Sequence, residues 1–168
     1  MSGVNYCGCS SYVIDVRGSA LALDDGMTEL NPPRVLIVED EQSIRDVLVE
    51  LFDVDGTRVE SAATLAEAKE VLACGSFDLI VTDIRLGGNR DGGLQVMAAA
   101  GVLSPDATVI ALTAYPDESN RHASIRLGAT HFLEKPVALE TLAELATRVG
   151  VPTAISPMRA STSPSTGR

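Results

Sequence analysis

The stretch "DLIVTDIRLGGNRDGGLQVM", Asp78 to Met97, joins a continuous apolar run to a glycine-rich loop and then to a helical pattern. An unbroken run of Leu, Ile and Val is typical of a strand that is buried on both faces of a parallel sheet. Thr82 and then Asp83 follow that run. The stretch therefore predicts a strand, a loop and a helix, with a carboxylate at the carboxyl end of the strand.

The same alternation of apolar runs and helical patterns extends from Arg34 to Gly150. Strands are expected over residues 34–38, 57–62, 78–82, 107–112 and 130–133. Helices are expected over residues 42–54, 65–74, 92–103, 117–128 and 139–149. Strict alternation predicts βαβ units, and right-handed crossovers between them favour a doubly wound sheet. The predicted fold class is α/β, with five parallel strands covered by helices on both faces.

Both ends of the 168-residue chain lack this alternation. Residues 1–33 show no sustained period and predict a flexible N-terminal extension, within which Met27 is an alternative start. Residues 151–168 are rich in Ser, Thr and Pro, which predicts a disordered C-terminal tail. The predicted domain is therefore residues 34–150.

Composition argues against several classes of protein. The net charge of −10 opposes nucleic-acid binding, because phosphates would be repelled. No apolar run approaches the roughly 18 residues of a membrane span, and no basic start precedes an apolar block as in a secretory signal. The three cysteines, Cys7, Cys9 and Cys74, are too few and too irregular for a disulfide framework, so a reducing cytoplasm is expected.

Polar side chains follow four of the five predicted strands. They are Glu39 and Asp40, Asp83, Thr113, and Lys135. Carboxyl ends of parallel strands meet at one edge of such a sheet, so these side chains are expected to lie together. Each residue alone has a plainer interpretation as a turn, a strand end or a helix start, and the case depends on their coincidence. Clustered carboxylates favour a bound Mg²⁺, and a carboxylate beside the ion and a lysine can accept a phosphoryl group.

Four segments in this order, "VLIVEDE", "DLIVTDIRL", "VIALTAY" and "GATHFLEKPV", resemble the signature segments of the receiver domain of two-component response regulators. The resemblance covers residues 34–149. It implies a flavodoxin-like receiver fold with strand order 2-1-3-4-5, in agreement with the alternation. It also implies a part in phosphorelay signalling.

The resemblance implies a role for each residue at the predicted edge. Asp83 would accept a phosphoryl group from a sensor histidine kinase or a histidine phosphotransfer protein. Glu39 and Asp40, together with Asp83 and the main-chain carbonyl of Arg85, would hold Mg²⁺. Thr113 would contact the phosphoryl group.

The remaining implied roles concern the phosphoryl group's other partner and the output. Lys135 would pair with the phosphoryl group, and its bond to Pro136 would be cis. Phe132 would be the switch aromatic that turns inward together with Thr113. The signal would then change the surface around the fourth helix, fifth strand and fifth helix, which faces an unidentified protein target or a second copy of the chain.

The sequence departs from the family in the loop after Asp83. The family usually has an apolar residue, a proline and a short step to Asp-Gly. Here Gly87 replaces the proline and residues 86–93 form a longer, glycine-rich run, so disorder of the loop is expected. Arg85 and Tyr115 are bulky residues at positions that flank the path of attacking water. On steric grounds we expect them to slow autodephosphorylation.

Eighteen residues follow Gly150 in this sequence, too few for an output domain. The expectation is a single-domain response regulator that acts as a shuttle, a regulator or a phosphate sink, and not an enzyme with free substrates. One alternative is an aspartate-nucleophile phosphohydrolase, but Arg85 stands where such enzymes have a second acid. The other is a degenerate receiver, although all the key residues are present. Surface or packing roles are expected for His122 and His131.

Overall fold

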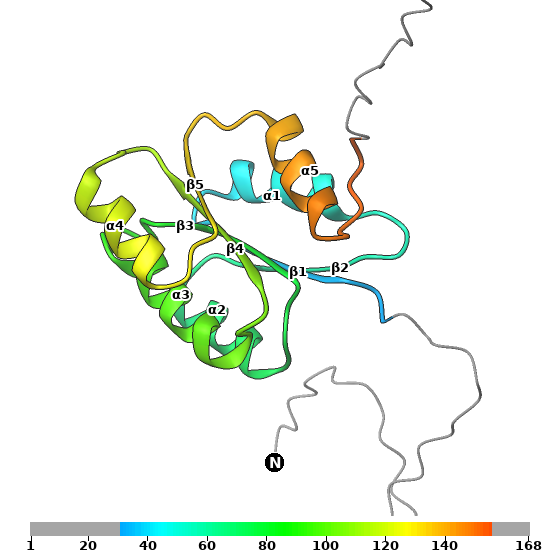
Figure 1. The fold of residues 1–168 in the computed structure, drawn as a ribbon, viewed down its shortest axis with the longest axis horizontal. Helices are drawn as coiled ribbons and strands as arrows, with labels where there is room; N and C mark the ends of the chain where they lie inside the picture. Colours follow the sequence, from blue (N-terminus) through cyan, green and yellow to red (C-terminus); the bar gives the residue numbers. More distant parts are fainter. Residues whose placement is uncertain (1–30, 156–168) are drawn as a thin grey trace, which may run out of the picture. The chain divides into compact units, whose positions relative to one another are not determined.

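The computed structural model describes residues 31–155, in which five strands alternate with five helices (Figure 1). The strands are β1 (Arg34–Val38), β2 (Arg58–Ala62), β3 (Leu79–Asp83), β4 (Thr108–Thr113) and β5 (His131–Glu134). The helices are α1 (Gln42–Phe52), α2 (Leu65–Ala73), α3 (Gly92–Leu103), α4 (Glu118–Arg126) and α5 (Leu139–Arg148). The predicted element order is confirmed, and the bounds differ from the expected ones by two residues at most.

All five strands are parallel and lie in the order β2-β1-β3-β4-β5, which confirms the predicted doubly wound sheet. Their register brings the carboxyl ends to one edge, since Asp83 is paired with Leu112 and Thr113 with Glu134. Strand order reverses between β1 and β3, the place where parallel α/β sheets form their sites. The functional candidates therefore lie at the reversal point.

Helices cover both faces of the sheet. In Figure 1, α1 and α5 lie on one face, and α2, α3 and α4 lie on the other. Successive residues of a strand point to opposite faces, so Val35 and Ile37 join the core beneath α1 and α5, whereas Leu36 and Val38 join the core beneath α2 and α3. This division explains why the three inner strands β1, β3 and β4 have nearly unbroken apolar sequences.

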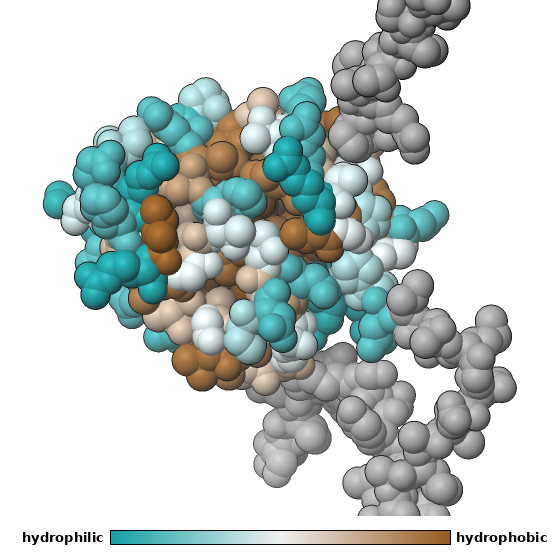
Figure 2. All heavy atoms as spheres, viewed as in Figure 1, coloured by the Kyte–Doolittle hydropathy of each residue, from teal (hydrophilic) through white to brown (hydrophobic). Residues whose placement is uncertain are grey.

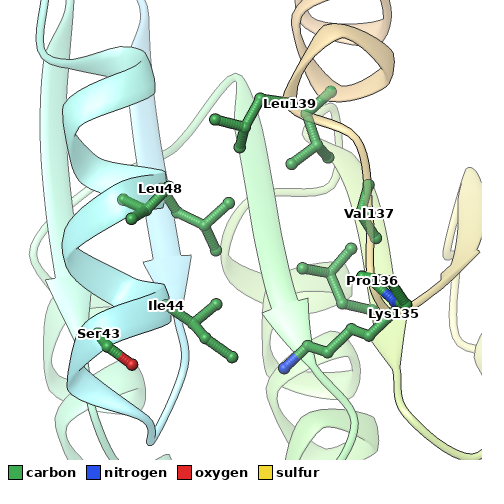
Figure 3. A pocket seen from close by; sticks show the side chains of 10 residues that line it. Ser43, Ile44, Leu48, Lys135, Pro136, Val137 and Leu139 are labelled. Atoms are coloured by element: carbon green, nitrogen blue, oxygen red, sulfur yellow. The ribbon is translucent and has the colours of Figure 1, made fainter.

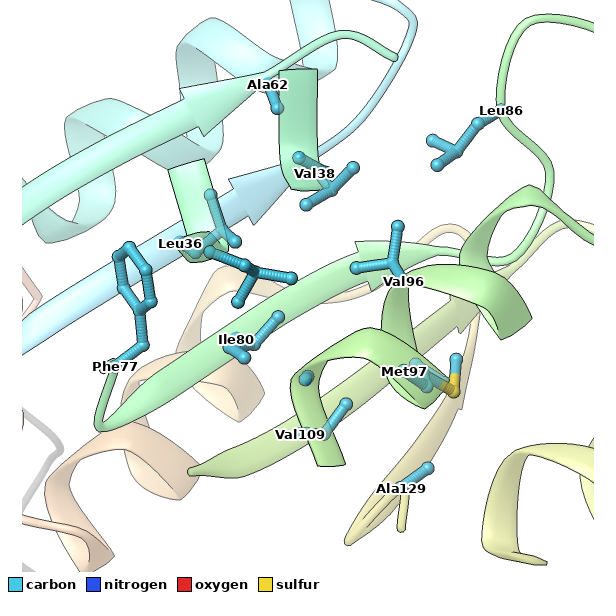
Figure 4. Close-up of a cluster of buried hydrophobic side chains, with 14 of the residues drawn as sticks. Leu36, Val38, Ala62, Phe77, Ile80, Leu86, Val96, Met97, Val109 and Ala129 are labelled. Atoms are coloured by element: carbon cyan, nitrogen blue, oxygen red, sulfur yellow. The ribbon is translucent and has the colours of Figure 1, made fainter. Parts of the chain in front are cut away.

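Figure 4 shows the second of these cores. Val96 and Met97 of α3 pack over Ile80 of β3 and Val109 of β4, and all four side chains are at most 4% exposed. Burying one such side chain contributes about 1.5–3 kcal/mol. The core therefore holds β3 and β4 firmly, and with them Asp83 and the residues at the end of β4.

Two helices begin at side-chain caps that set where their loops end. Thr64 accepts a hydrogen bond from the Glu67 N–H at 3.2 Å at the start of α2, and Asp117 accepts one from the Asn120 N–H at 2.7 Å at the start of α4. Each cap satisfies one of the backbone donors that a helix start leaves without a partner. The loop from β4 to α4, next to the candidate site, thus has a defined end.

The packed part of the chain extends beyond the expected boundary at Gly150. Val151 is 1% exposed, the Ala154 N–H donates to the Leu51 carbonyl at 2.8 Å, and Ile155 packs against the core beneath α1 and α5. Residues 151–155, expected in the tail, are therefore held by apolar contacts that follow the last helix. A composition-based boundary misses such contacts.

Several expectations fall outside residues 31–155: the flexible N-terminal extension up to residue 30, Met27, Cys7 and Cys9, and the tail from residue 156. Cys74 lies at the end of α2 and is exposed. Within the part of the chain that the structure describes, no helix is both long enough and apolar enough to cross a membrane.

Candidate functional site

Three carboxylates meet at the reversal point of the sheet. Glu39 and Asp40 follow β1, and Asp83 is the last residue of β3. One carboxylate oxygen from each lies within 4.8 Å of the others. Glu39 is 1% exposed and Asp83 is 7% exposed, whereas Asp40 is open to solvent. The cluster is therefore anchored in the core by two acids and open on the side of the third.

Lys135 supplies a positive charge to this cluster. Its Nζ donates to Asp83 Oδ2 at 2.5 Å and to Glu39 Oε2 at 2.7 Å. It follows β5, and its bond to Pro136 is cis, as expected. Burial would lower the pKa of Lys135, but the hydrogen bonds and charges of Asp83 and Glu39 raise it above its ordinary value. Lys135 is thus a cation at neutral pH.

Burial has the opposite effect on Glu39. It raises the pKa of the Glu39 carboxyl, and the charge of Asp83 adds to this, while Lys135 opposes it. Two acids therefore share one ammonium, with a third acid close by. A divalent cation among these oxygens would relieve their repulsion.

Main-chain and side-chain donors fix the acids in place. The Arg85 N–H donates to Asp83 Oδ1 at 2.9 Å, so each oxygen of Asp83 has a partner. The Arg45 guanidinium donates to the Glu39 carbonyl at 2.6 Å and to the Asp40 carbonyl at 3.3 Å. Asp83 is therefore held rigidly, and the loop that carries Glu39 and Asp40 is held from α1.

Thr113 ends β4 beside Asp83 and is 1% exposed. Its hydroxyl accepts from the Tyr115 N–H at 3.1 Å and donates to the Tyr115 carbonyl at 3.2 Å. These bonds direct the hydroxyl toward the loop that follows β4. The Thr113 hydroxyl therefore has both a donor and an acceptor partner in the main chain of Tyr115.

Arg85 and Tyr115 are in direct contact. The Arg85 guanidinium lies over the Tyr115 ring at 3.9 Å from its centroid, and the Tyr115 side chain is largely exposed. The loops after β3 and β4 are thereby joined next to Asp83. Both residues are bulky candidates in the sequence, but their contact depends on loop geometry that the sequence does not predict.

The glycine-rich loop is an ordered turn, contrary to the expected disorder. Gly87 and Gly88 have φ of 57° and 79°, and the main chains of Leu86 and Asn89 exchange two hydrogen bonds at 2.9 and 3.1 Å. Two successive residues with positive φ are what a tight type I′ turn needs, and glycine adopts them without strain. The Gly87 N–H also donates to Asp40 Oδ2 at 3.1 Å. The glycines thus shape the site.

The donor set fits Mg²⁺. The cluster offers carboxylate oxygens from Glu39, Asp40 and Asp83, and hard oxygen ligands are those that Mg²⁺ takes. Lys135 contacts two of these three acids, Glu39 and Asp83, so the site favours a further cation. The main-chain carbonyl of Arg85 remains an expected further ligand.

Comparison with known proteins identifies the family. The family model for the response regulator receiver domain matches residues 35–147, more than half of the chain. The chain belongs to the response regulator receiver domain family. The structure brings Lys135 together with the carboxylate cluster, and Thr113 ends β4, the strand next to β3.

Curated relatives of this receiver domain include longer proteins. The response regulator MprA of Mycobacterium sp. (strain KMS) is 33% identical over 111 residues, which cover 66% of this chain and 47% of MprA. The response regulator protein PilR of Pseudomonas aeruginosa is 37% identical over 113 residues, which cover 67% of this chain and 25% of PilR. The chain thus spans less than half the length of these relatives.

Solved structures show the same receiver fold. A CheY-like receiver domain protein from Methanospirillum hungatei JF-1 has a TM-score of 0.64 and 29% identity, over 70% of this chain and 94% of that one. A response regulator from Burkholderia pseudomallei, solved with a phosphorylated aspartic acid, calcium ion and citrate, has a TM-score of 0.62 and 28% identity. That match covers 70% of this chain and 69% of the other.

The residue that the resemblance makes the switch aromatic, Phe132, lies on β5. Phe132 is half-buried on β5, packs against the core beneath α2 and α3, and has the Arg121 guanidinium 5.9 Å from its ring centroid. His122 is exposed on α4, with Nε2 3.8 Å from Glu118, and His131 is a half-buried strand residue. Both histidines therefore have the surface or packing positions expected of them.

Two contacts of the site are not predicted from the sequence. They are the hydrogen bonds that Arg45 donates to the main chain after β1 and the hydrogen bond that the Gly87 N–H donates to Asp40. Arg45 had a detectable signal, because a cation near the start of a helix opposes the helix dipole and so suggests another purpose. Gly87 had none, since its partner Asp40 lies 47 positions earlier in the chain.

Proposed function

We propose that Asp83 accepts a phosphoryl group from a phosphohistidine of a sensor histidine kinase or a histidine phosphotransfer protein, with Mg²⁺ bound by Glu39, Asp40 and Asp83. The observation that carries the proposal is that Lys135 and the Arg85 N–H hold the two oxygens of Asp83 beside two further acids. This arrangement presents a fixed carboxylate within a field that can stabilise phosphoryl oxygens.

In the proposed step, an oxygen lone pair of Asp83 forms a bond to phosphorus. The bond from phosphorus to the donor's imidazole nitrogen breaks, and its electron pair returns to that nitrogen. Bound Mg²⁺ supplies charge that neutralises the phosphoryl oxygens. Lys135 keeps its contact with the cluster and pairs with a phosphoryl oxygen. The donor's other ring nitrogen carries a proton before the bond breaks, so the products are an acyl phosphate on Asp83 and a neutral histidine on the donor.

Thr113 and Phe132 would carry the resulting change outward. The Thr113 hydroxyl would exchange its bonds to Tyr115 for one to the phosphoryl group, and this moves the loop between β4 and α4. Phe132 on β5 would turn inward into the space that this movement opens. The surface of α4, β5 and α5 would then differ between the two states and select the partner.

An apolar groove beside the site suits the phosphohistidine-bearing partner. The groove has a volume of about 420 Å³ and lies between α1 and the segment from Lys135 to Leu139 (Figure 3). Ile44 and Leu48 line it from α1, and Val137 lines it from the opposite side. Figure 2 shows apolar surface between β5 and the helices α1 and α5, and hydrophilic side chains over α4. Lys135 both lines the groove and contacts Asp83, which supports a donor that binds in the groove and presents its histidine to Asp83.

We further infer a regulator or phosphorelay shuttle that acts by protein contact in the cytoplasm. The net charge of −10 supports a protein partner over a nucleic acid, and the sparse cysteines fit a reducing compartment. Turnover of free substrates, as in a phosphohydrolase, is disfavoured, since Arg85 stacks on Tyr115 where a second acid would be needed. The chain would thus be a phosphoacceptor and not an enzyme with its own substrate.

The test is incubation of the full chain with acetyl phosphate and Mg²⁺, followed by mass measurement of the intact protein. The expected result is a gain of one phosphoryl group that needs Mg²⁺ and disappears in Asp83→Asn. The matched control is Asp91→Asn, which changes an exposed acid in the neighbouring loop and should still gain the group. An unmodified, folded parent chain would overturn the proposal.

A further inference from the structure

The turn at Gly87 and Gly88 is braced on both sides. Leu86, before it, is 3% exposed in the core, and the Asn89 side chain, after it, accepts from the Asp91 N–H at 3.0 Å. Leu86 and Asn89 also bond to each other through their main chains. The N–H of Gly87 therefore has a fixed direction, and it is directed at Asp40 Oδ2.

This bond depends on glycine at position 87. A proline, which the receiver resemblance leads one to expect here, has no N–H to donate, and its ring fixes φ near −65° rather than the 57° seen. The replacement of that proline therefore both permits the turn and provides the donor. The longer glycine-rich loop is the part of the sequence that departs most from the family pattern.

Asp40 is the exposed member of the acidic cluster. Glu39 and Asp83 are held by Lys135, whereas the bond from the Gly87 N–H is what orients the Asp40 carboxylate from across the site. Hydrogen bonds to a ligating carboxylate fix its orientation, and their loss typically weakens metal binding about 10–100-fold. An exposed ligand has the most rotamer freedom to lose on binding, so it gains most from such a bond.

We propose that the Gly87 main-chain N–H is a positioning group for the metal site, which holds Asp40 Oδ2 so that the Asp40 carboxylate stays directed at Glu39 and Asp83. This inference depends on the Mg²⁺ site of the proposed function and adds to it a second contribution of the glycine-rich loop. The loop after β3 then acts on the metal site from two positions, the Asp83 contact at Arg85 and the Asp40 contact at Gly87.

Two substitutions at position 87 separate the donor from the turn. Gly87→Pro creates a Pro-Gly pair, which favours a type II turn that still reverses the chain but has no N–H at the first position. Gly87→Asn creates an Asn-Gly pair, which favours the type I′ turn already present and keeps the N–H. The second is the conservative variant that should rescue any loss.

The measurement is the Mg²⁺ dissociation constant of the full, unphosphorylated chain by calorimetric titration. We expect Gly87→Pro to weaken Mg²⁺ binding about tenfold and Gly87→Asn to change it by less than about twofold. The unfolding midpoint of each variant in EDTA checks that the fold is retained. In the Mg²⁺-free parent, the Gly87 amide proton should also exchange slowly with solvent, and faster in Asp40→Ala, which removes the acceptor.

The outcomes distinguish this inference from the proposed function. Normal Mg²⁺ affinity in Gly87→Pro, or equal losses in both variants, would overturn the positioning role while leaving the metal site intact. A fast-exchanging Gly87 amide in the parent would do the same. A parent chain that does not bind Mg²⁺ would overturn the proposed metal site and the positioning role together.

Discussion

The Arg85 guanidinium lies over the Tyr115 ring, 3.9 Å from its centroid, and so joins the two loops that border Asp83. The main chain of Arg85 holds Asp83, and the main chain of Tyr115 holds the Thr113 hydroxyl. The pair therefore connects the residue that would be phosphorylated to the residue that would respond.

We predict that the stacked pair slows hydrolysis of the acyl phosphate by limiting the access of water to Asp83. An exposed contact between a cation and an aromatic ring contributes about 0.5–1 kcal/mol, which corresponds to about a two- to fivefold change in rate. Arg85→Ala and Tyr115→Ala should each speed decay of the phosphorylated chain by about that factor. Decay is followed by intact mass after removal of acetyl phosphate.

Two further variants test whether the side chains act as a pair. The double substitution should decay no faster than either single one, because both remove the same contact. Tyr115→Phe keeps the ring and should decay as the parent does. Additive effects in the double variant, or half-lives that do not change, would contradict the pairing.

We predict that the phosphodonor docks in the groove between α1 and the segment after β5. Val47 lines the groove and is 46% exposed, so Val47→Asp places a charge on the contact surface without disturbing the core. Loss of one well-placed interface contact costs more than about 1 kcal/mol, so we expect phosphotransfer from a kinase to slow roughly fivefold to tenfold. Phosphorylation by acetyl phosphate should be unchanged, because it needs no docking.

The measurement is phosphotransfer from the autophosphorylated histidine kinases of the source organism, profiled one by one. Val102→Asp is the control, because Val102 is 79% exposed on α3, on the opposite face of the sheet. Equal rates for both variants would exclude the groove as the docking site. Slowing with acetyl phosphate as well would mean that Val47 acts on the chemistry.

Much of this site follows from the sequence because the responsible interactions are local or periodic. Strands buried on both faces must be apolar throughout, so the runs before Glu39 and Asp83 are visible, and parallel strands must bring their carboxyl ends to one edge. What escapes prediction depends on three-dimensional contact. The Gly87 bond to Asp40 and the stacking of Arg85 on Tyr115 depend on loop geometry that no local pattern encodes.

The glycine-rich loop is the clearest example of a structure that the sequence does not predict. A high glycine content indicates that the loop backbone can adopt many conformations, but it does not predict which of them the folded chain adopts. At Gly87 and Gly88 a single positive-φ arrangement is selected by the two bonds between Leu86 and Asn89. The same kind of contact explains the C-terminal boundary, where Val151 is buried by partners distant in sequence.

We predict that the buried carboxyl of Glu39 makes the unfolding free energy depend on pH. Its pKa is raised in the folded chain by burial, so its contribution to stability is fully present below pH 4.5, its ordinary pKa, and is lost as the pH rises through the raised pKa. Glu39→Gln has no ionisable group at this position, so it does not lose unfolding free energy in this way as the pH rises. In EDTA, the unfolding free energy of the variant relative to the parent should therefore increase as the pH rises above 4.5.

Denaturant unfolding at several pH values between about 4 and 8 measures this difference, across the range where the shift of the carboxyl acts. Glu144→Gln, an exposed glutamate on α5, is the matched control and should show no such trend relative to the parent. A difference for Glu39→Gln that stays constant across the range would contradict the role of burial.

Gly93 makes the sharpest prediction about the backbone that supports Asp83. A Cβ at this position would lie 2.0 Å from the Asp83 carbonyl oxygen and 2.6 Å from the Ile84 Cα, so both main-chain groups would have to move. Overpacking of this kind costs about 1–3 kcal/mol. Gly93→Ala should therefore lower the unfolding free energy by about that amount and also slow phosphorylation, because the displaced backbone carries Asp83.

Gly101 of the same helix has open space around its Cβ position, so Gly101→Ala should instead stabilise the chain by about 0.5–1 kcal/mol. Unfolding in urea compares the two, and equal effects would show that the close approach at Gly93 is not what requires glycine there.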